Sequence, residues 1–190
     1  ADLWNELGRQ ARERKMRLYT HNHDAAYNFL LDSGPLDEQG RPTRSSGVRK
    51  LEYFMAKTDA KYVYFEMDIY WGYVARHKHH TFINSAGRER TRVFDPILTV
   101  APRPRRFPLF HAKDGARSPE QSNGYEMTPM GDGDINFQQF FQTIGHYDFH
   151  HANWEQDTAP GGSENPGQSL EFAERSYQHM SELTVYSQGE

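Results

Sequence analysis

Pairs of ionisable side chains recur at four places along the chain, each at the end of a stretch rich in β-forming residues. The pairs are His21 and His23, Glu66 and Asp68, His111 and Lys113, and Glu155 and Asp157. Alternate residues of a strand point to the same face, so each pair would present both side chains on one side of its strand. Carboxylates bind hard divalent ions such as Mn²⁺ or Mg²⁺, and imidazole extends the choice to Zn²⁺ or Co²⁺. Together the four pairs predict a metal site.

The elements that must position these pairs alternate between strand and helix. Strands are predicted over 17–21, 61–71, 107–111 and 147–157, and helices over 1–15, 48–58, 134–145 and 169–183. Between them lie a turn-rich stretch over 32–47, a long loop or hairpin followed by a short helix over 72–106, and a glycine-containing loop over 112–133. This alternation predicts an α/β fold with a parallel sheet, in which the carboxyl ends of the strands carry the site.

Two of the predicted helices have a definite core face. In 134–145, Asp134 is the expected N-cap, Gly145 the expected end, and the inward residues are Phe137, Phe140, Phe141 and Ile144. In 169–183, the residues expected to point inward are Leu170, Ala173, Tyr177 and Met180.

The composition excludes several classes of function. With a net charge of -4, the chain of 190 residues has no global basic footprint for nucleic acid. The absence of cysteine excludes disulfides, thiolate metal sites and a cysteine nucleophile. No apolar run approaches the roughly 20 residues of a membrane helix. A single domain over 1–190 is expected, cytoplasmic by default, with export possible if a signal precedes this segment.

Each candidate residue has a simpler explanation when it is taken alone. A histidine at a strand end is more often a hydrogen-bonded polar residue than a ligand, Asp68 alone could cap a helix, and Glu155 alone could pair with an arginine. The segment HKHH (77–80) predicts a solvated loop, because no carboxylate or strand frames it. Before the fourth pair, His151 is predicted to line the pocket and His150 to face the helix layer. Only the joint pattern of the four pairs favours a functional site.

Five motifs carry a resemblance to a known group of proteins. In order and spacing, YTHNHD, FEMDIYW, FHAKDG, GDGDINFQQFF and WEQD resemble the sugar phosphate isomerase/epimerase superfamily, which has the xylose-isomerase-like TIM barrel. The resemblance implies a (β/α)8 barrel of which this chain supplies about the last four βα units, its C-terminal half. The N-terminal half would then lie outside this sequence, upstream or on a partner, and a homo-oligomer partner is also compatible.

The resemblance also implies a site with one divalent metal ion, usually manganese, with Mg²⁺, Co²⁺ or Zn²⁺ as alternatives. The ligands would be His21, Asp68, His111 and Glu155. His21 is a departure from the family pattern, because an imidazole stands where relatives have a glutamate. Relatives with an HNHD strand also often carry a glutamate three residues after the second histidine, and this chain has Ala26 there.

The reaction that the resemblance implies is proton abstraction next to a carbonyl, with a metal-stabilised enediolate, on a sugar or polyol. Glu155 or His23 would be the base, and Lys113 would bind a substrate oxygen or neutralise the enolate. The alternative for Lys113 is a salt bridge with Asp114 or Glu155. Trp71 and His151 would contact the substrate.

Three other functions stay open beside an isomerase or epimerase. His21 in place of a carboxylate disfavours a symmetric two-carboxylate epimerase, so a lyase, dehydratase or glycoside-cleaving eliminase acting on a keto-sugar also fits. A non-catalytic barrel subunit is the second alternative. An abasic-site endonuclease is the third, and it is disfavoured by the acidic charge balance and by Trp71 where a further histidine would be expected. Neither nucleic acid nor a membrane is an expected partner.

Overall fold

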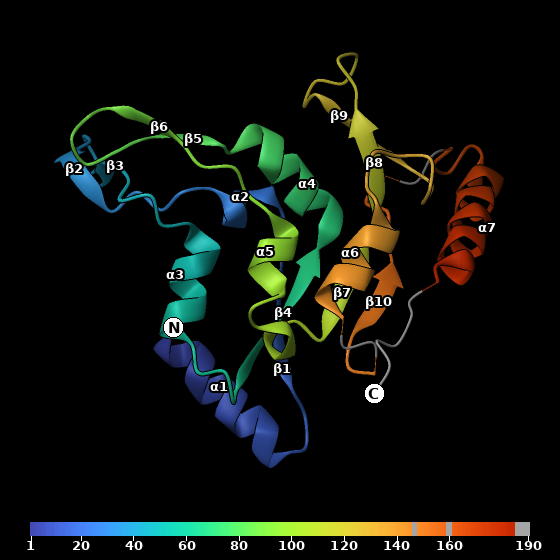
Figure 1. The fold of residues 1–190 in the computed structure, drawn as a ribbon, viewed down its shortest axis with the longest axis horizontal. Helices are drawn as coiled ribbons and strands as arrows, with labels where there is room; N and C mark the ends of the chain where they lie inside the picture. The colour runs from blue at the N-terminus through green and yellow to red at the C-terminus, as the bar shows by residue number, and fades with distance from the viewer. Residues whose placement is uncertain (146–147, 159–160, 185–190) are drawn as a thin grey trace. The chain divides into compact units, whose positions relative to one another are not determined.

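The computed structural model describes residues 1–145, 148–158 and 161–184 (Figure 1). The chain divides into two compact units, the first comprising Ala1–Phe65 and Trp71–Asp95 and the second Glu66–Tyr70 and Pro96–Glu190. Strand β4 (Val63–Asp68) and helix α4 (Ile69–Lys78) contribute residues to both units. The expectation of a single domain stays a prediction.

The first unit contains the predicted N-terminal helices and strand. Besides its share of β4 and α4, its elements are α1 (Asp2–Glu13), β1 (Leu18–Asn22), α2 (Asp24–Tyr27), β2 (Ser33–Leu36), β3 (Pro42–Arg44), α3 (Lys50–Lys57), β5 (Thr81–Ile83) and β6 (Glu89–Thr91). The predictions for 1–15, 17–21 and 48–58 are confirmed to within two residues at each end. Helix α1 lies close to the chain before β4 because Gly8 has no Cβ, which would overlap the carbonyl oxygen of Tyr62.

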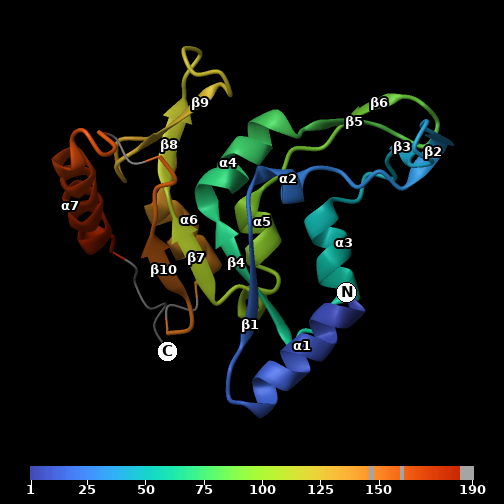
Figure 2. The same ribbon diagram turned by 180° about the vertical axis from the view of Figure 1, so that it is seen from behind.

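Two β-hairpins occupy stretches predicted as turns or loops. Strands β2 and β3 pair antiparallel, as do β5 and β6, and the backbone N–H of Ser45 donates to the carbonyl of Ile83 at 2.9 Å. Figure 2 shows the four strands beside one another. The hairpin within 72–106 confirms one of the two predicted possibilities. Helix α4 was missed because its start, IYWGYV, consists mostly of residues with high β-propensity.

Arg49 connects segments of the first unit that are far apart in the sequence. Its buried guanidinium donates to the carbonyl oxygens of His79, at 3.0 Å, and of Arg92. It also lies 4.3 Å from the ring centroid of Phe29 and 5.3 Å from that of Phe94. Burial lowers the pKa of Arg49 to about 10, so the side chain remains a cation near neutral pH and keeps these contacts.

The prediction of a solvated loop for HKHH is wrong. His77 and Lys78 belong to the last turn of α4, and the carboxylate of Asp24 lies 3.1 Å from Lys78 Nζ and 2.9 Å from His79 Nε2. Burial raises the pKa of Asp24, but the bonds to Lys78 and His79 outweigh it and leave the pKa below its usual value. A carboxylate distant in sequence therefore frames this segment, and Lys78 and His79 make structural contacts with it.

The second unit is built on parallel strands. Besides its share of β4 and α4, its elements are α5 (Pro96–Val100), the 3-10 helix η1 (Pro104–Arg106), β7 (Leu109–Ala112), β8 (Asp114–Arg117), β9 (Tyr125–Thr128), α6 (Phe137–Ile144), β10 (His151–Trp154) and α7 (Pro166–Glu182). Strands β4 and β10 both pair parallel with β7. In the described residues the strands of this sheet follow the order β1-β4-β7-β10. The predicted parallel sheet is thus present, although β10 is shorter than the predicted strand, whose residue 147 lies outside the described residues.

A hairpin also replaces the predicted loop over 112–133. Strands β8 and β9 pair antiparallel, with Asp114 opposite Thr128. Gly115 makes the close approach possible, because a Cβ there would overlap the carbonyl oxygen of Glu126 and the ring of Tyr70. The glycine that suggested a loop is therefore the residue that lets this hairpin form.

Helix α6 has the predicted core face. Phe137, Phe140, Phe141 and Ile144 are all buried. Phe110 of β7 makes edge-to-face contacts with Phe140 and Phe141, at ring distances of 5.5 and 5.9 Å. The helix ends at Gly145 as predicted, with φ at 62°. Its N-cap is Asn136 instead of Asp134, because the side chain of Asn136 accepts the N–H of Gln139 at 2.8 Å.

Replacing Asn136 with alanine should lower the free energy of unfolding by about 1 kcal/mol, because an N–H of the first turn loses its acceptor. Urea unfolding followed by circular dichroism measures the effect. Gln139→Ala, at an exposed position of the same helix, is the matched control and should change stability less. Equal effects of the two substitutions would contradict the assignment of Asn136 as the cap.

Helix α7 confirms the predicted helix but only part of its predicted inward face, because Ala173 and Met180 are half-buried and the other two residues are exposed. Leu170 and Tyr177 are each 72% exposed, whereas Ser176 is fully buried. The Ser176 hydroxyl accepts the backbone N–H of Met130 at 3.1 Å. The helix presents this small polar side chain because the loop after β9 approaches it with its backbone, and a hydrophobic pattern does not reveal such a contact.

None of the helices in the described part of the chain combines the length and apolar character that crossing a membrane requires.

Candidate active site

The register of β4, β7 and β10 sets the level of the predicted site residues in the second unit. His111 of β7 lies opposite Asp68 of β4 and opposite Asn153 of β10. Lys113 and Glu155 each follow the last residue of their strand, β7 and β10. Side chains alternate along each strand, so these four ionisable groups leave the sheet on one face. The structure brings Asp68, His111, Lys113 and Glu155 together, and their roles stay predictions.

Asp68 is the most deeply buried member of this group. It is the last residue of β4 and directly precedes α4, so regular backbone fixes it on both sides. The residue has no exposed surface, and its Oδ2 lies 2.9 Å from Lys113 Nζ and 3.8 Å from His111 Nδ1. A buried carboxylate needs compensating partners, and this one faces an ammonium and an imidazole.

The imidazole of His111 lies between carboxylates. Its Nδ1 is 3.2 Å from Glu155 Oε2, and its Nε2 is 3.4 Å from Glu66 Oε1. Glu66 therefore contacts the ring nitrogen that faces away from Asp68 and Glu155. A carboxylate in that position fixes the orientation and tautomer of a histidine that uses its other nitrogen as a ligand.

Lys113 is the cation of the cluster. Its side chain is 1% exposed, and its Nζ contacts Asp68, Glu155 and, at 2.7 Å, Asp157 Oδ2. Burial lowers the pKa of Lys113, but the carboxylates of Asp68, Asp157 and Glu155 outweigh it and raise the pKa above its usual value. The predicted salt bridge with Glu155 is present. Asp114 is used differently, as an acceptor of backbone N–H groups.

Two members of the cluster, Glu66 and Asp157, belong to the predicted pairs but had no role of their own in the sequence-based prediction. Glu66 contacts His111, and Asp157 contacts Lys113. The signal that identifies them is the same alternation that singled out their neighbours, since each lies two residues from a predicted ligand, Asp68 or Glu155. Glu66 holds the imidazole of His111, and Asp157 holds the ammonium of Lys113. Spacing in the sequence alone does not distinguish such a supporting carboxylate from a metal ligand.

The cluster is rich in negative charge. Four carboxylates, Glu66, Asp68, Glu155 and Asp157, surround one ammonium and one imidazole. Nearby, the pKa of Tyr70 rises to about 12, because of burial first and then the charges of Asp68 and Asp157. An excess of carboxylates over cations is the electrostatic setting that a divalent ion neutralises.

The donor set fits a divalent metal ion. Ligand atoms that share one ion lie about 3 Å apart. His111 Nδ1 lies 3.8 Å from Asp68 Oδ2 and 3.2 Å from Glu155 Oε2. Two carboxylates and one imidazole suit Mn²⁺, Mg²⁺, Co²⁺ or Zn²⁺. These three residues could hold the predicted metal, although Lys113 contacts two of the same oxygen atoms.

The remaining predicted residues near HNHD belong to the first unit. His21 lies on β1 and His23 follows it, and their rings meet edge to face at 5.4 Å. The ring of His23 stacks on Trp71 at 4.9 Å, with 21° between the planes. Both histidines are exposed. The structure thus brings His23 and Trp71 together, while the metal role of His21 and the catalytic role of His23 stay predictions.

The two histidines at the start of β10 point differently. His150 Nδ1 donates to the carbonyl of Phe107 at 2.8 Å, and its ring lies 5.2 Å from that of Phe110, which packs on α6. His150 therefore faces the helix layer, as predicted. His151 is exposed at the first position of β10, and its contact with substrate stays a prediction.

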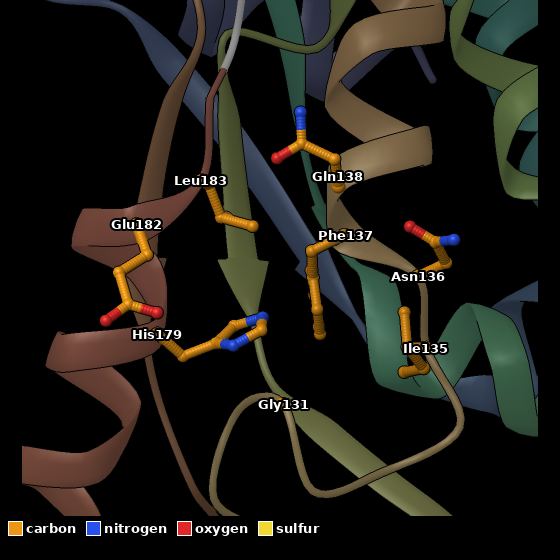
Figure 3. Close-up of a pocket in the computed structure, with 8 residues that line it drawn as sticks. All are labelled: Gly131, Ile135, Asn136, Phe137, Gln138, His179, Glu182 and Leu183. Atoms are coloured by element: carbon orange, nitrogen blue, oxygen red, sulfur yellow. The ribbon is translucent and has the colours of Figure 1, made fainter.

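A pocket of about 360 Å³ lies elsewhere in the second unit. It is lined by Gly131, Ile135, Asn136, Phe137, Gln138, His179, Glu182 and Leu183. Figure 3 shows His179 of α7 and Phe137 of α6 on facing sides of this space. None of the clustered ionisable residues at the strand ends lines this pocket. The pocket and the cluster that contains Asp68 are therefore separate features.

Two solved structures from Parabacteroides distasonis ATCC 8503, each a sugar phosphate isomerase/epimerase, are similar to this chain. The first is 23% identical, with a TM-score of 0.66, over 95% of this chain and 52% of its own. The second is 17% identical, with a TM-score of 0.63, over 97% of this chain and 53% of its own. The chain shares their fold.

The chain spans about half the length of each of these two proteins. The likeness predicted from the five motifs is confirmed at the level of the fold, and the parallel sheet with its helices fits part of a TIM barrel. No protein-family model matches the chain, and no curated protein sequence matches it.

Proposed function

We propose that this chain forms the C-terminal half of a (β/α)8 barrel, supplying about its last four βα units, and that the barrel isomerises or epimerises a sugar or polyol. The observation that supports this most is the cluster of Asp68, His111, Lys113 and Glu155 at the carboxyl ends of three adjacent parallel strands. In barrels of this kind the active site lies at that end of the strands.

Asp68, His111 and Glu155 would hold one divalent ion, with His21 as the fourth ligand. Mn²⁺ is the first candidate because two of the three donors are carboxylates. When bound, the ion supplies Lewis-acid stabilisation of the negative charge that develops on a carbonyl oxygen. Glu66 orients the ring of His111 toward this position.

Exposure separates the roles of the two ligand carboxylates. The side chain of Glu155 is 32% exposed, whereas Asp68 is fully buried. A base that removes a proton from a bound substrate must reach that substrate, so Glu155 is the proton acceptor and Asp68 only a ligand. Lys113 lies buried beside Glu155, and the positive charge of its ammonium neutralises the negative charge that develops on the substrate.

His23, Trp71 and His151 are assigned to the substrate in this proposal, on the basis of the sequence. Trp71 already stacks on His23, which holds the imidazole in one orientation. His23 serves as a second proton-transfer group, and Trp71 and His151 contact the sugar or polyol. A nearby N-terminal half, on the same chain or on a partner, supplies the rest of the pocket wall.

Proton exchange into deuterated water tests this proposal at the level of the shared chemical step. With a panel of ketoses and keto-polyols, we expect deuterium to enter the carbon next to the carbonyl. The exchange should stop after chelation and return on addition of Mn²⁺. NMR of the products separates isomerisation and epimerisation from elimination. Exchange that persists unchanged after chelation, or no exchange with any of these substrates, would contradict the proposal.

A further inference from the structure

The ammonium of Lys113 lies where the carboxylates of the second unit converge. Nζ contacts Asp68 Oδ2 at 2.9 Å, Asp157 Oδ2 at 2.7 Å, and Glu155 Oε2. The side chain is 1% exposed, so water screens these contacts little. Two of the three oxygens belong to Asp68 and Glu155, the residues proposed as metal ligands. Lys113 and a divalent ion would therefore draw on the same two atoms.

We propose that Lys113 is a built-in counter-cation of the metal site, which bridges Asp68 and Glu155 and moves to Asp157 alone when a divalent ion binds. Asp157 is then a positioning residue, because it holds the ammonium after the other two carboxylates are given up. This inference rests on the proposed function for the identity of the metal ligands. It adds that Lys113 exchanges its carboxylate partners when the ion binds, and that this exchange sets the affinity of the site for the ion.

The chemistry of the cluster favours exchange over simple exclusion of one cation by the other. An ammonium and a divalent ion repel each other strongly at a few ångströms in a poorly solvated site. The four carboxylates leave a negative excess even when Lys113 is charged, so both cations can be accommodated if they do not share oxygens. A lysine ammonium on its flexible four-carbon stem can shift between neighbouring acceptors, whereas an arginine fork would be held in one geometry.

A purely structural role for Lys113 makes a different prediction. If Lys113 only neutralised buried Asp68, its removal would destabilise the fold without strengthening metal binding. The proposed exchange predicts that removal of Lys113 frees both ligand carboxylates and tightens metal binding. Metal affinity is therefore the measurement that separates the two roles.

Isothermal titration with Mn²⁺ on the protein, Lys113→Met and Asp157→Asn tests the exchange. Lys113→Met should bind Mn²⁺ at least about tenfold more tightly, and Mn²⁺ should raise its melting temperature by more than that of the unsubstituted protein. Asp157→Asn should bind Mn²⁺ more weakly, because Lys113 has lost its alternative partner. Lys61→Met and Asp132→Asn, at exposed positions, are matched controls and should leave the affinity unchanged.

The double variant Lys113→Met/Asp157→Asn closes the cycle. Asp157→Asn should have no effect on Mn²⁺ affinity once Lys113 is absent, because Asp157 acts on the metal only through the ammonium. An effect of Asp157→Asn that persists in the Lys113→Met background overturns the exchange. So does Lys113→Met binding no tighter than the unsubstituted protein, or the absence of Mn²⁺ binding altogether. If Lys113→Met fails to fold, Lys113→Gln takes its place in the cycle.

The outcome is distinguishable from a failure of the proposed function. Mn²⁺ affinities that follow the cycle, without any deuterium exchange on ketoses, would support the Lys113 exchange and overturn the isomerase or epimerase. Deuterium exchange on ketoses, with Mn²⁺ affinities that are the same in the protein and in all of its variants, would support the isomerase or epimerase and overturn the Lys113 exchange.

Discussion

Replacing Glu155 with glutamine is expected to slow deuterium exchange next to the substrate carbonyl by about 10²–10⁴-fold, the usual contribution of a general base. Glutamine keeps the size of the side chain and one of its oxygens, but it cannot accept the proton. Of the two ligand carboxylates, Glu155 is the partly exposed one, so its loss should act on the proton-transfer step directly. The measurement is the exchange rate by NMR.

Saturating Mn²⁺ separates a lost base from a lost ligand. If Glu155→Gln slowed exchange only by weakening metal binding, added Mn²⁺ would restore the rate. We expect the rate to stay low. Glu120→Gln, which changes an exposed glutamate in the segment between β8 and β9, is the matched control and should exchange at the unsubstituted rate. A Glu155→Gln protein that keeps that rate at saturating Mn²⁺ would show that Glu155 is not the base.

The convergence of Asp68, His111, Lys113 and Glu155 was predictable from the sequence because two simple rules determine it. Side chains alternate along a strand, and parallel strands place their carboxyl ends at one edge of a sheet. Neither rule says which group will bond to which. Asp157 therefore looked like one more strand-end carboxylate, although it holds the ammonium of Lys113.

The same limit explains the errors in the fold. The contacts of Asp24 with Lys78 and His79 join positions more than 50 residues apart, so no local pattern in the sequence predicts them. The exposed Leu170 of α7 follows a helical hydrophobic spacing, but the backbone N–H of Met130, in the loop after β9, bonds to Ser176 on another face of the helix. Local periodicity predicts that a helix forms, while the identity of its partner decides which face is buried.

His21 shows where spacing stops being informative. Its position on a strand was predicted correctly, whereas His23 follows the end of that strand and its ring meets that of His21 edge to face. A ligand role, however, depends on groups from other segments of a barrel, and these are set by tertiary arrangement. The predicted ligand role of His21 is therefore tested by metal titration of a His21→Ala protein.

Asp114→Ala is expected to cost the largest share of stability, about 3–5 kcal/mol, because one buried and three partly buried hydrogen bonds lose their acceptor at once. The carboxylate of Asp114 accepts the backbone N–H groups of Gly115 at 2.8 Å, Gly131 at 2.9 Å, Gly133 at 3.2 Å and Ile135 at 3.4 Å. Burial raises the pKa of Asp114, and these four donors oppose the shift. Urea unfolding of the protein measures the loss.

Two further variants show that the hydrogen bonds, and not the charge of the loop, carry this effect. Asp132→Asn, in the same loop, removes a carboxylate that is 45% exposed and pairs with Arg175, so it should cost less than about 1 kcal/mol. Asp114→Asn keeps one acceptor oxygen but turns an amide N–H₂ toward two of the backbone donors, and it should fall between the other two. If Asp114→Ala cost no more than Asp132→Asn, the loop from 131 to 135 would be held by its glycine turns and its contact with α7. In that case, the burial of the neighbouring Lys113 would depend on its own contacts with Asp68, Glu155 and Asp157, and not on the hydrogen bonds of Asp114.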